Sequence, residues 1–97
     1  MLGLTVRDLD AAAFNQLDLP NRTRGVLITR VEPLSSSFDA EMQRDTVLIE
    51  INRKPVNSVA DFRRLAGAAR PGDVVALYVY VPELDQRKLV TVRVEDR

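Results

Sequence analysis

Three consecutive serines, Ser35, Ser36 and Ser37, are the residues of this sequence whose type most readily suggests covalent chemistry. A serine nucleophile requires a neighbouring base, which is usually histidine, and the sequence contains no histidine. Lys54 is the nearest candidate base in the sequence, and would have to act in a Ser–Lys pair. The sequence therefore disfavours catalysis by these serines, and we expect no catalytic residue and no enzyme activity in this chain.

The composition excludes several other kinds of site. Cysteine is absent as well as histidine, which removes disulfides, thiolate nucleophiles and most zinc sites. We expect neither a metal ion nor a cofactor. The 14 Lys and Arg residues balance the 14 Asp and Glu residues, which disfavours binding to nucleic acid or to a membrane surface. No run is long and apolar enough to insert into a bilayer.

The stretch from Leu2 to Val6 suggests non-covalent binding instead. Gly3 lies between two leucines, and a glycine lets the backbone turn tightly and lets another chain approach closely. Amides in such a turn can point the same way and bind an anion, including the terminal carboxylate of a peptide. The same stretch also fits an ordinary strand start. A site is favoured by the predicted helix over 58–69, which could form the second wall of a groove.

The elements that would position this site follow from hydrophobic patterning. The sequence predicts a strand from Leu4, a short helix over 11–17 capped by Asp10, and strands over 26–31 and 46–51, the second buried on both faces. Between these strands the serines start a helical turn, in which Ser36 and Asp39 have the spacing of a capping box.

The second half of the chain contains the most regular predicted helix, over 58–69, with a capping box formed by Ser58 and Asp61. Strands over 74–81 and 89–95 follow, joined by a polar connection over 82–87. At 97 residues, with 45% hydrophobic and 29% charged residues, the chain is one globular domain. The helix places its apolar residues at a spacing of three and four, at Val59, Phe62, Leu65, Ala66 and Ala69.

The order of these elements resembles a PDZ domain, most closely that of the bacterial high-temperature-requirement (Do-type) serine proteases. Leu2-Gly3-Leu4 resembles the carboxylate-binding loop, 25–37 resembles the strand and proline–serine turn, and 45–56 resembles the aspartate–hydrophobic–asparagine signature. Two features depart from the family pattern: Arg44 replaces the usual glycine, and serines replace residues that are usually proline and alanine. The resemblance implies an α+β fold, a partly open and mostly antiparallel barrel or sandwich of five to six strands with two to three helices.

The resemblance also implies how a ligand would bind. A peptide would lie antiparallel along 4–7, and its carboxylate would accept hydrogen bonds from the amides of Leu2, Gly3 and Leu4. Ser58 replaces the family's specificity histidine, but a plain helix cap is the favoured interpretation of this residue, and the apolar helix residues could instead pack in the core. The predicted ligand-binding residues are Leu2, Gly3, Leu4, Thr5, Val6, Ser58, Phe62 and Leu65.

By the same resemblance, residues 1–97 form a single PDZ-like domain excised from a longer, periplasmic or cell-envelope protease chain. Its partners would be the C-terminal peptides of unfolded or partner proteins, together with an attached protease domain in cis. The alternative is a structural interaction module that packs on neighbouring domains to assemble or gate an oligomer, with its groove unused.

Overall fold

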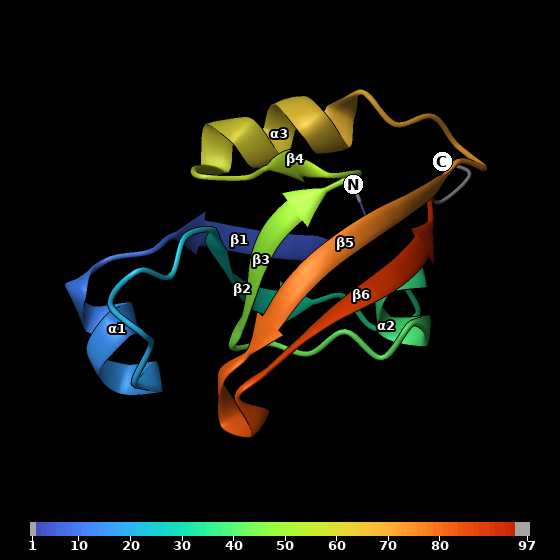
Figure 1. Ribbon diagram of the computed structural model, residues 1–97. Coiled ribbons are helices and arrows are strands. Elements are labelled where there is room, and N and C mark those ends of the chain that lie inside the picture. Colours follow the sequence, from blue (N-terminus) through green and yellow to red (C-terminus); the bar gives the residue numbers. More distant parts are fainter. Residues whose placement is uncertain (1, 95–97) are drawn as a thin grey trace.

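The computed structural model describes residues 2–94, which form one antiparallel sheet and its covering helices (Figure 1). Six strands join in the sheet, with the order β1-β2-β3-β5-β6, and β4 pairs with β3 outside this path. The elements in chain order are β1 (Leu4–Asp8), α1 (Ala11–Leu17), β2 (Val26–Val31), α2 (Ser36–Asp39), β3 (Thr46–Ile51), β4 (Lys54–Pro55), α3 (Val59–Gly67), β5 (Val74–Val81), the 3-10 helix η1 (Pro82–Leu84) and β6 (Gln86–Arg93).

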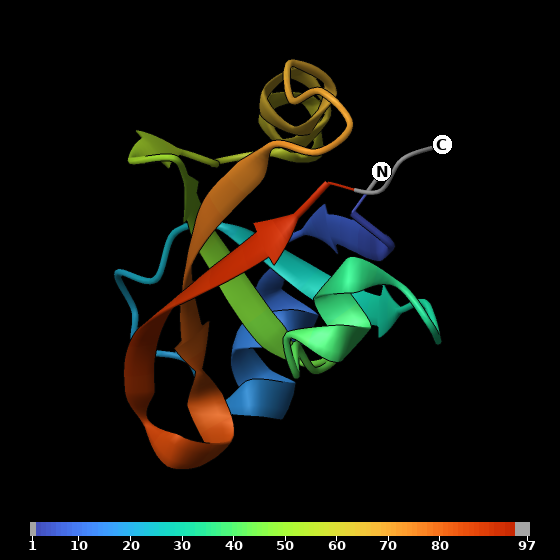
Figure 2. The ribbon, with the colours of Figure 1, turned by 90° about the vertical axis from the view of Figure 1, so that its right-hand side faces the viewer.

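The sheet curves around its core, so that β5 and β6 lie on one side and β1 and α2 on the other, with α3 above (Figure 2). Within residues 2–94, β1 pairs only with β2 and β6 only with β5, so these two strands lie at the two ends of the strand order, each with a free edge. The predicted α+β class, with a partly open sheet and a few helices, is confirmed. No helix within residues 2–94 has the length and hydrophobicity needed to cross a membrane.

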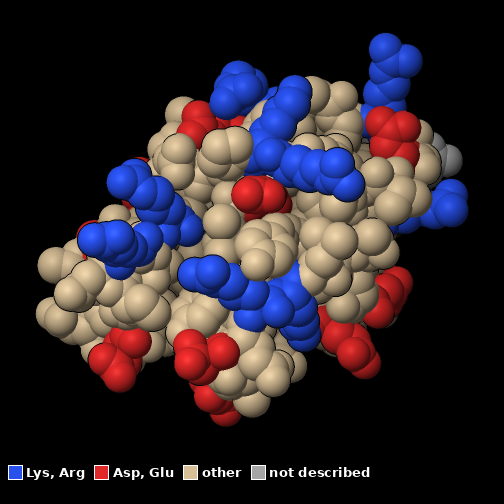
Figure 3. Space-filling model, viewed as in Figure 1, with Lys and Arg blue, Asp and Glu red and all other residues tan. Residues whose placement is uncertain are grey.

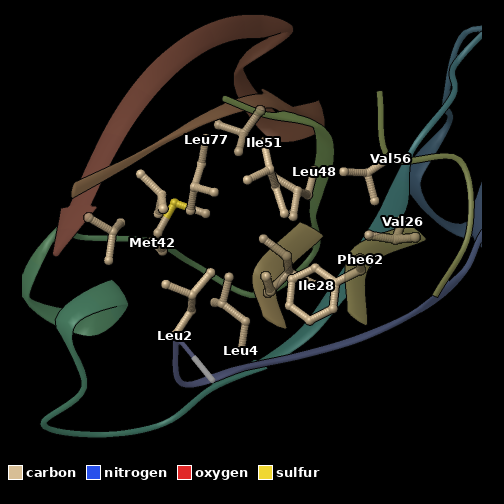
Figure 4. Packing of buried hydrophobic residues seen from close by; sticks show 14 residues of the cluster. Leu2, Leu4, Val26, Ile28, Met42, Leu48, Ile51, Val56, Phe62 and Leu77 are labelled. Atoms are coloured by element: carbon tan, nitrogen blue, oxygen red, sulfur yellow. The ribbon is translucent and has the colours of Figure 1, made fainter. Parts of the chain in front are cut away.

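Hydrophobic side chains pack on both faces of the sheet because its central strands alternate. In β5, Leu77 and Val79 face the main core, whereas Tyr80 faces a smaller cluster with Val47 and Leu19. The prediction that the strand over 46–51 is buried on both faces is therefore confirmed. The main core contains Leu2, Leu4, Val26, Ile28, Met42, Leu48, Ile51, Val56, Phe62 and Leu77, which Figure 4 labels, and four further residues.

Most predicted elements match the structure, but several boundaries were wrong. Strand β6 begins at Gln86 and not at 89, because the residues before it turn within η1 and at Asp85, whose φ is 48°. Its predicted end at Glu95 lies outside the described residues. Helix α3 is shorter than predicted, ending at Gly67. The cap of α2 is Ser35 rather than Ser36, because the Ser35 hydroxyl accepts from the amide of Phe38.

Candidate binding site at the first strand

The turn that precedes β1 requires a glycine. Leu2 and Gly3 both have positive φ, of 57° and 68°, and consecutive residues of this kind bring neighbouring amides to one side of the chain. A Cβ on Gly3 would lie 2.3 Å from the Cβ of Ser35, far inside van der Waals contact. Gly3 is therefore needed both for its backbone conformation and for the close approach of the segment that leads into α2.

The carbonyls of this turn are held from inside the fold, which fixes the direction of its amides. The hydroxyl of Ser37 donates to the Leu2 carbonyl, and the amide of Glu32 donates to the Gly3 carbonyl at 2.7 Å. In a trans peptide group the N–H points opposite to the C=O. The N–H groups of Gly3 and Leu4 thus point away from the β2–α2 segment. The Leu2 amide shares its peptide group with Met1, which lies outside the described residues.

The ladder between β1 and β2 shows which backbone groups face the free edge. Leu4 is paired with Val31 while the Glu32 amide bonds the Gly3 carbonyl, so Leu4 occupies a non-hydrogen-bonded position. Leu4, Val6 and Asp8 accordingly direct their N–H and C=O groups outward. Thr5 is turned toward β2, and its carbonyl accepts from the Thr29 hydroxyl at 3.2 Å. A strand added at this edge would therefore bond to alternate residues of β1.

The side chains of β1 alternate in the same way. Leu4 is buried and Val6 half-buried on the core side, whereas Thr5 is exposed on the other face. Helix α3 lies beside β1, and its Phe62 is only 5% exposed, in the same core cluster as Leu2 and Leu4 (Figure 4). Leu65 packs partly buried against that cluster. The structure thus brings the predicted apolar site residues together, whereas Thr5 lies on the other face of β1. A ligand contact stays a prediction for all of them.

The other end of the site is defined by the start of α3. The Ser58 hydroxyl accepts from the amide of Asp61 at 3.1 Å, so Ser58 is the helix cap, and its contact with a ligand stays a prediction. Asp8, the last residue of β1, accepts from the amide of Val59 at 2.8 Å. The carboxylate of Asp61 accepts from the amide of Asn57 at 3.0 Å. This backbone hydrogen bond, with a smaller contribution from Arg64, lowers the pKa of Asp61.

Sequence reasoning did not identify two of the residues that shape the site. Ser37 is fully buried and bonds the turn at Gly3 across 35 positions, and Asp8 joins β1 to α3 across 51 positions. Neither long-range bond has a local sequence signal. The serines considered as nucleophiles are thus placed by their structural contacts: Ser35 caps α2, and Ser37 supports the turn at Gly3.

Comparison with curated proteins shows similarity to Do-type serine proteases. The chain is 34% identical over 71 residues to the periplasmic pH-dependent serine endoprotease DegQ of Escherichia coli, which covers 73% of the chain. It is 35% identical over 48 residues, 50% of the chain, to a probable serine protease do-like of Buchnera aphidicola. These alignments span only 15% and 10% of the relatives' lengths. No protein-family model matches the chain.

Comparison with solved structures shows the fold. The HtrA-type protease AlgW, solved with a decapeptide, matches the whole chain at a TM-score of 0.83 and 20% identity, over 29% of its own length. The HtrA3 PDZ domain, bound to the phage-derived ligand FGRWV, matches 96% of the chain at a TM-score of 0.75 and 17% identity, over 82% of its length. The fold of the described residues is that of a PDZ domain.

Proposed function

We propose that this chain, which has the PDZ fold and is similar in sequence to Do-type serine proteases, captures carboxylate-ended hydrophobic peptides by strand addition to β1. The observation that carries the proposal is the direction of the Gly3 and Leu4 amides. Both point out of the fold at the start of a free sheet edge, because the carbonyls of Leu2 and Gly3 are bonded inside it. An anion placed there would meet at least two converging donors.

The ligand would run antiparallel to β1. Its carboxylate accepts from Gly3 and Leu4, its last amide donates to the Leu4 carbonyl, and its third residue from the end exchanges hydrogen bonds with Val6. Hydrogen bonds to a charged group contribute about 1.5–3 kcal/mol each before entropy losses. Two or three such bonds support binding in the micromolar range, where a Kd of about 1 μM corresponds to about 8 kcal/mol.

The ligand's last side chain would lie on the core side of β1, next to Leu4, Val6 and the α3 residues Phe62 and Leu65. Phe62 already fills much of this space. We therefore expect a medium aliphatic or small aromatic terminal residue, which agrees with the valine that ends the HtrA3 ligand FGRWV. A serine at Ser58 reaches less far than a histidine, so preference for a hydroxylated ligand residue would be weak.

The wider setting follows from the relatives. DegQ is a periplasmic protease by its name, and AlgW is an HtrA-type protease solved with a decapeptide. We infer that this chain is a domain of a periplasmic or envelope-associated serine protease. In that protein it would bind the C-termini of unfolded or partner proteins for a protease domain in cis.

A pair of peptides that differ only at the carboxyl end tests the proposal. A hexapeptide ending in valine is titrated into the chain by calorimetry, first with a free carboxylate and then as its amide. The free acid should bind at least about tenfold more tightly, the equivalent of one charge-assisted bond. Equal affinity for the two forms would contradict the carboxylate site.

A second candidate is a structural interaction module whose groove is unused. It is favoured by the packing of the chain's own side chains between β1 and α3, where Leu2 is 2% and Phe62 5% exposed. In that case neither peptide binds. The domain would instead bind to a neighbouring domain of its parent protein, and titration with that isolated domain would show it.

A further inference from the structure

We propose that the face of the sheet opposite α3 binds an acidic peptide segment, in a pocket bounded by Arg22, Arg24 and Arg87. This pocket has a volume of about 290 Å³, just below the range of about 300–1,000 Å³ that is typical of small-molecule sites. It is separate from the edge of β1, and the inference does not depend on the proposed function. Its lining comes from the loop before β2 and from three strands, and consists of Pro20, Arg22, Thr23, Arg24, Ile49, Glu50, Tyr78, Tyr80 and Arg87.

The alternation of β5 places the pocket on the outer face of the sheet. Leu77 and Val79 point into the main core, where Phe62 of α3 also lies. Side chains alternate along a strand, so Tyr78 and Tyr80 point to the opposite face. Tyr80 packs there in the second hydrophobic cluster, and its hydroxyl donates to Asp85 at 2.7 Å. The ring of Tyr80, held by these contacts, and that of the half-buried Tyr78 therefore provide an apolar floor, and a ligand on it would not compete with one bound along β1.

Among the described residues, the arginines around this floor form no ion pair with a carboxylate. Arg30, Arg44 and Arg64 each form an ion pair, whereas no ion pair within residues 2–94 involves the three arginines of the pocket. The only acidic residue in the lining is Glu50, and Asp85 adds a second carboxylate at its edge, on the Tyr80 hydroxyl, so three positive charges face two negative ones. Figure 3 shows basic side chains across the middle of this face, with acidic groups between them and along its lower side.

This arrangement fits carboxylates next to an aromatic or apolar side chain. A guanidinium binds a carboxylate through two parallel hydrogen bonds, and tyrosine rings pack against apolar groups and cations. A small excess of positive charge, in a chain whose formal net charge is zero, suits one or two carboxylates better than a nucleic acid or another polyanion. The occupant is therefore a segment of a protein that carries one or two acidic side chains beside an aromatic one.

The test uses the isotope-labelled chain and the blocked peptide acetyl-Asp-Phe-Glu-amide, which has no free carboxyl end for β1. Its neutral twin, acetyl-Asn-Phe-Gln-amide, and inorganic phosphate are titrated in parallel. The acidic peptide should shift the amide resonances of Ile49, Tyr78 and Tyr80 and leave those of Gly3 and Leu4 unchanged. The affinity should fall by about five- to tenfold when Arg22→Gln and Arg24→Gln are combined, which is the effect of losing two partly exposed ion pairs.

Arg63→Gln is the matched control, because Arg63 is an exposed arginine on α3, on the other side of the sheet. It should leave the affinity unchanged, and thermal melting confirms that all variants are folded. The inference is overturned if the neutral twin binds as well as the acidic peptide or if the paired substitution has no effect. It is equally overturned if phosphate alone produces the same shifts with the same affinity, since the site would then be a simple anion site.

Discussion

The buried hydroxyl of Ser37 donates a hydrogen bond to the carbonyl of Leu2, and so connects α2 to the turn before the first strand. This bond, with that from Glu32 to Gly3, decides which way the turn's amides point. The proposed anion site is therefore controlled by residues that a ligand would never touch.

Replacing Ser37 by alanine should weaken both the fold and the binding of carboxylate-ended peptides. It leaves the Leu2 carbonyl without its donor, at a cost of about 1–3 kcal/mol in the free energy of unfolding. Urea denaturation and peptide titration measure the two effects. Ser35→Ala is the control: it removes the cap of α2, at about 0.5–2 kcal/mol, but leaves the bond to Leu2 in place. If both variants bound peptide like the wild type, Ser37 would have no part in orienting the amides.

Replacing Gly3 by alanine should be more damaging than the same change at Gly72. Both glycines have positive φ, which costs alanine about 1–2 kcal/mol. Only Gly3 also has a neighbour within contact distance, the side chain of Ser35, whereas nothing lies within 4 Å at Gly72. The crowding should add about 1–3 kcal/mol, measured as the difference between the two unfolding free energies. Equal destabilisation would show that the segment at Ser35 moves aside freely.

Removing the carboxylate of Asp8 should loosen the end of the site farthest from Gly3. Asp8→Ala deletes the acceptor for the Val59 amide and should cost about 0.3–1 kcal/mol, whereas Asp8→Asn keeps an acceptor oxygen. In the proposed register the fifth ligand residue from the carboxyl end falls opposite Asp8. The Asp8–Val59 bond is expected to restrict this ligand residue in the wild type, and Asp8→Ala removes the restriction. Lengthening a tetrapeptide to a hexapeptide should therefore increase affinity more in Asp8→Ala than in the wild type. Identical gains would show that the Asp8–Val59 bond does not restrict the ligand.

Replacing Phe62 by leucine should change which terminal residue the site prefers. Phe62 is 5% exposed and packs in the core cluster with Leu4, so truncation to alanine would cost about 3–5 kcal/mol. Leucine retains most of the packing and opens space beside β1. The ratio of affinities for peptides ending in phenylalanine and in valine should rise. Arg63→Ala, on the exposed side of the same helix, is the control and should leave this ratio unchanged. If Phe62→Leu also left the ratio unchanged, Phe62 would be a core residue with no part in ligand preference.

The start of α3 should lose stability in acid through Asp61. Its pKa is lowered in the folded state, first by the Asn57 amide and then by Arg64, from an ordinary value of 3.8. A pKa that is lower in the folded state than in the unfolded state stabilises the folded state at pH values above the unfolded-state pKa. This stabilisation is lost as the pH falls through the folded-state pKa. The Tm of the wild type should therefore decrease more than that of Asp61→Asn between about pH 7 and about pH 2.5. Parallel decreases would show that this interaction contributes nothing to stability.

The parts of the fold that the sequence predicts well are those with strong local signals. Helix α1 begins with three alanines after the Asp10 cap, β5 is a continuous run of apolar residues, and β3 is apolar except for Thr46 and Glu50. The start of β6 was missed because Gln86, Arg87 and Lys88 are polar and exposed, as is usual in an edge strand, and so resemble a loop. Local patterns therefore locate buried strands better than strands at an edge.

The site was predicted only as far as its local signals reach. Gly3 between leucines and the spacing of Phe62 and Leu65 located the loop and the helix face. The contacts that hold them in place, from Ser37 and Asp8, join residues far apart in the chain and depend on the finished fold. The arginine pocket also escaped sequence analysis, because its members come from a loop and a strand more than sixty positions apart.

The two edges of the sheet differ in a way that affects behaviour at high concentration. Exposed Gln86, Arg87 and Lys88 on β6 disfavour the pairing of that edge with another molecule, since charged side chains on a border strand oppose intermolecular β-pairing. Strand β1 spans only five residues, from Leu4 to Asp8, and its first three residues carry no charge. Edge-to-edge pairing between molecules would therefore stop at a β1-to-β1 pair. A dimer, rather than a fibre, is the expected product at high protein concentration.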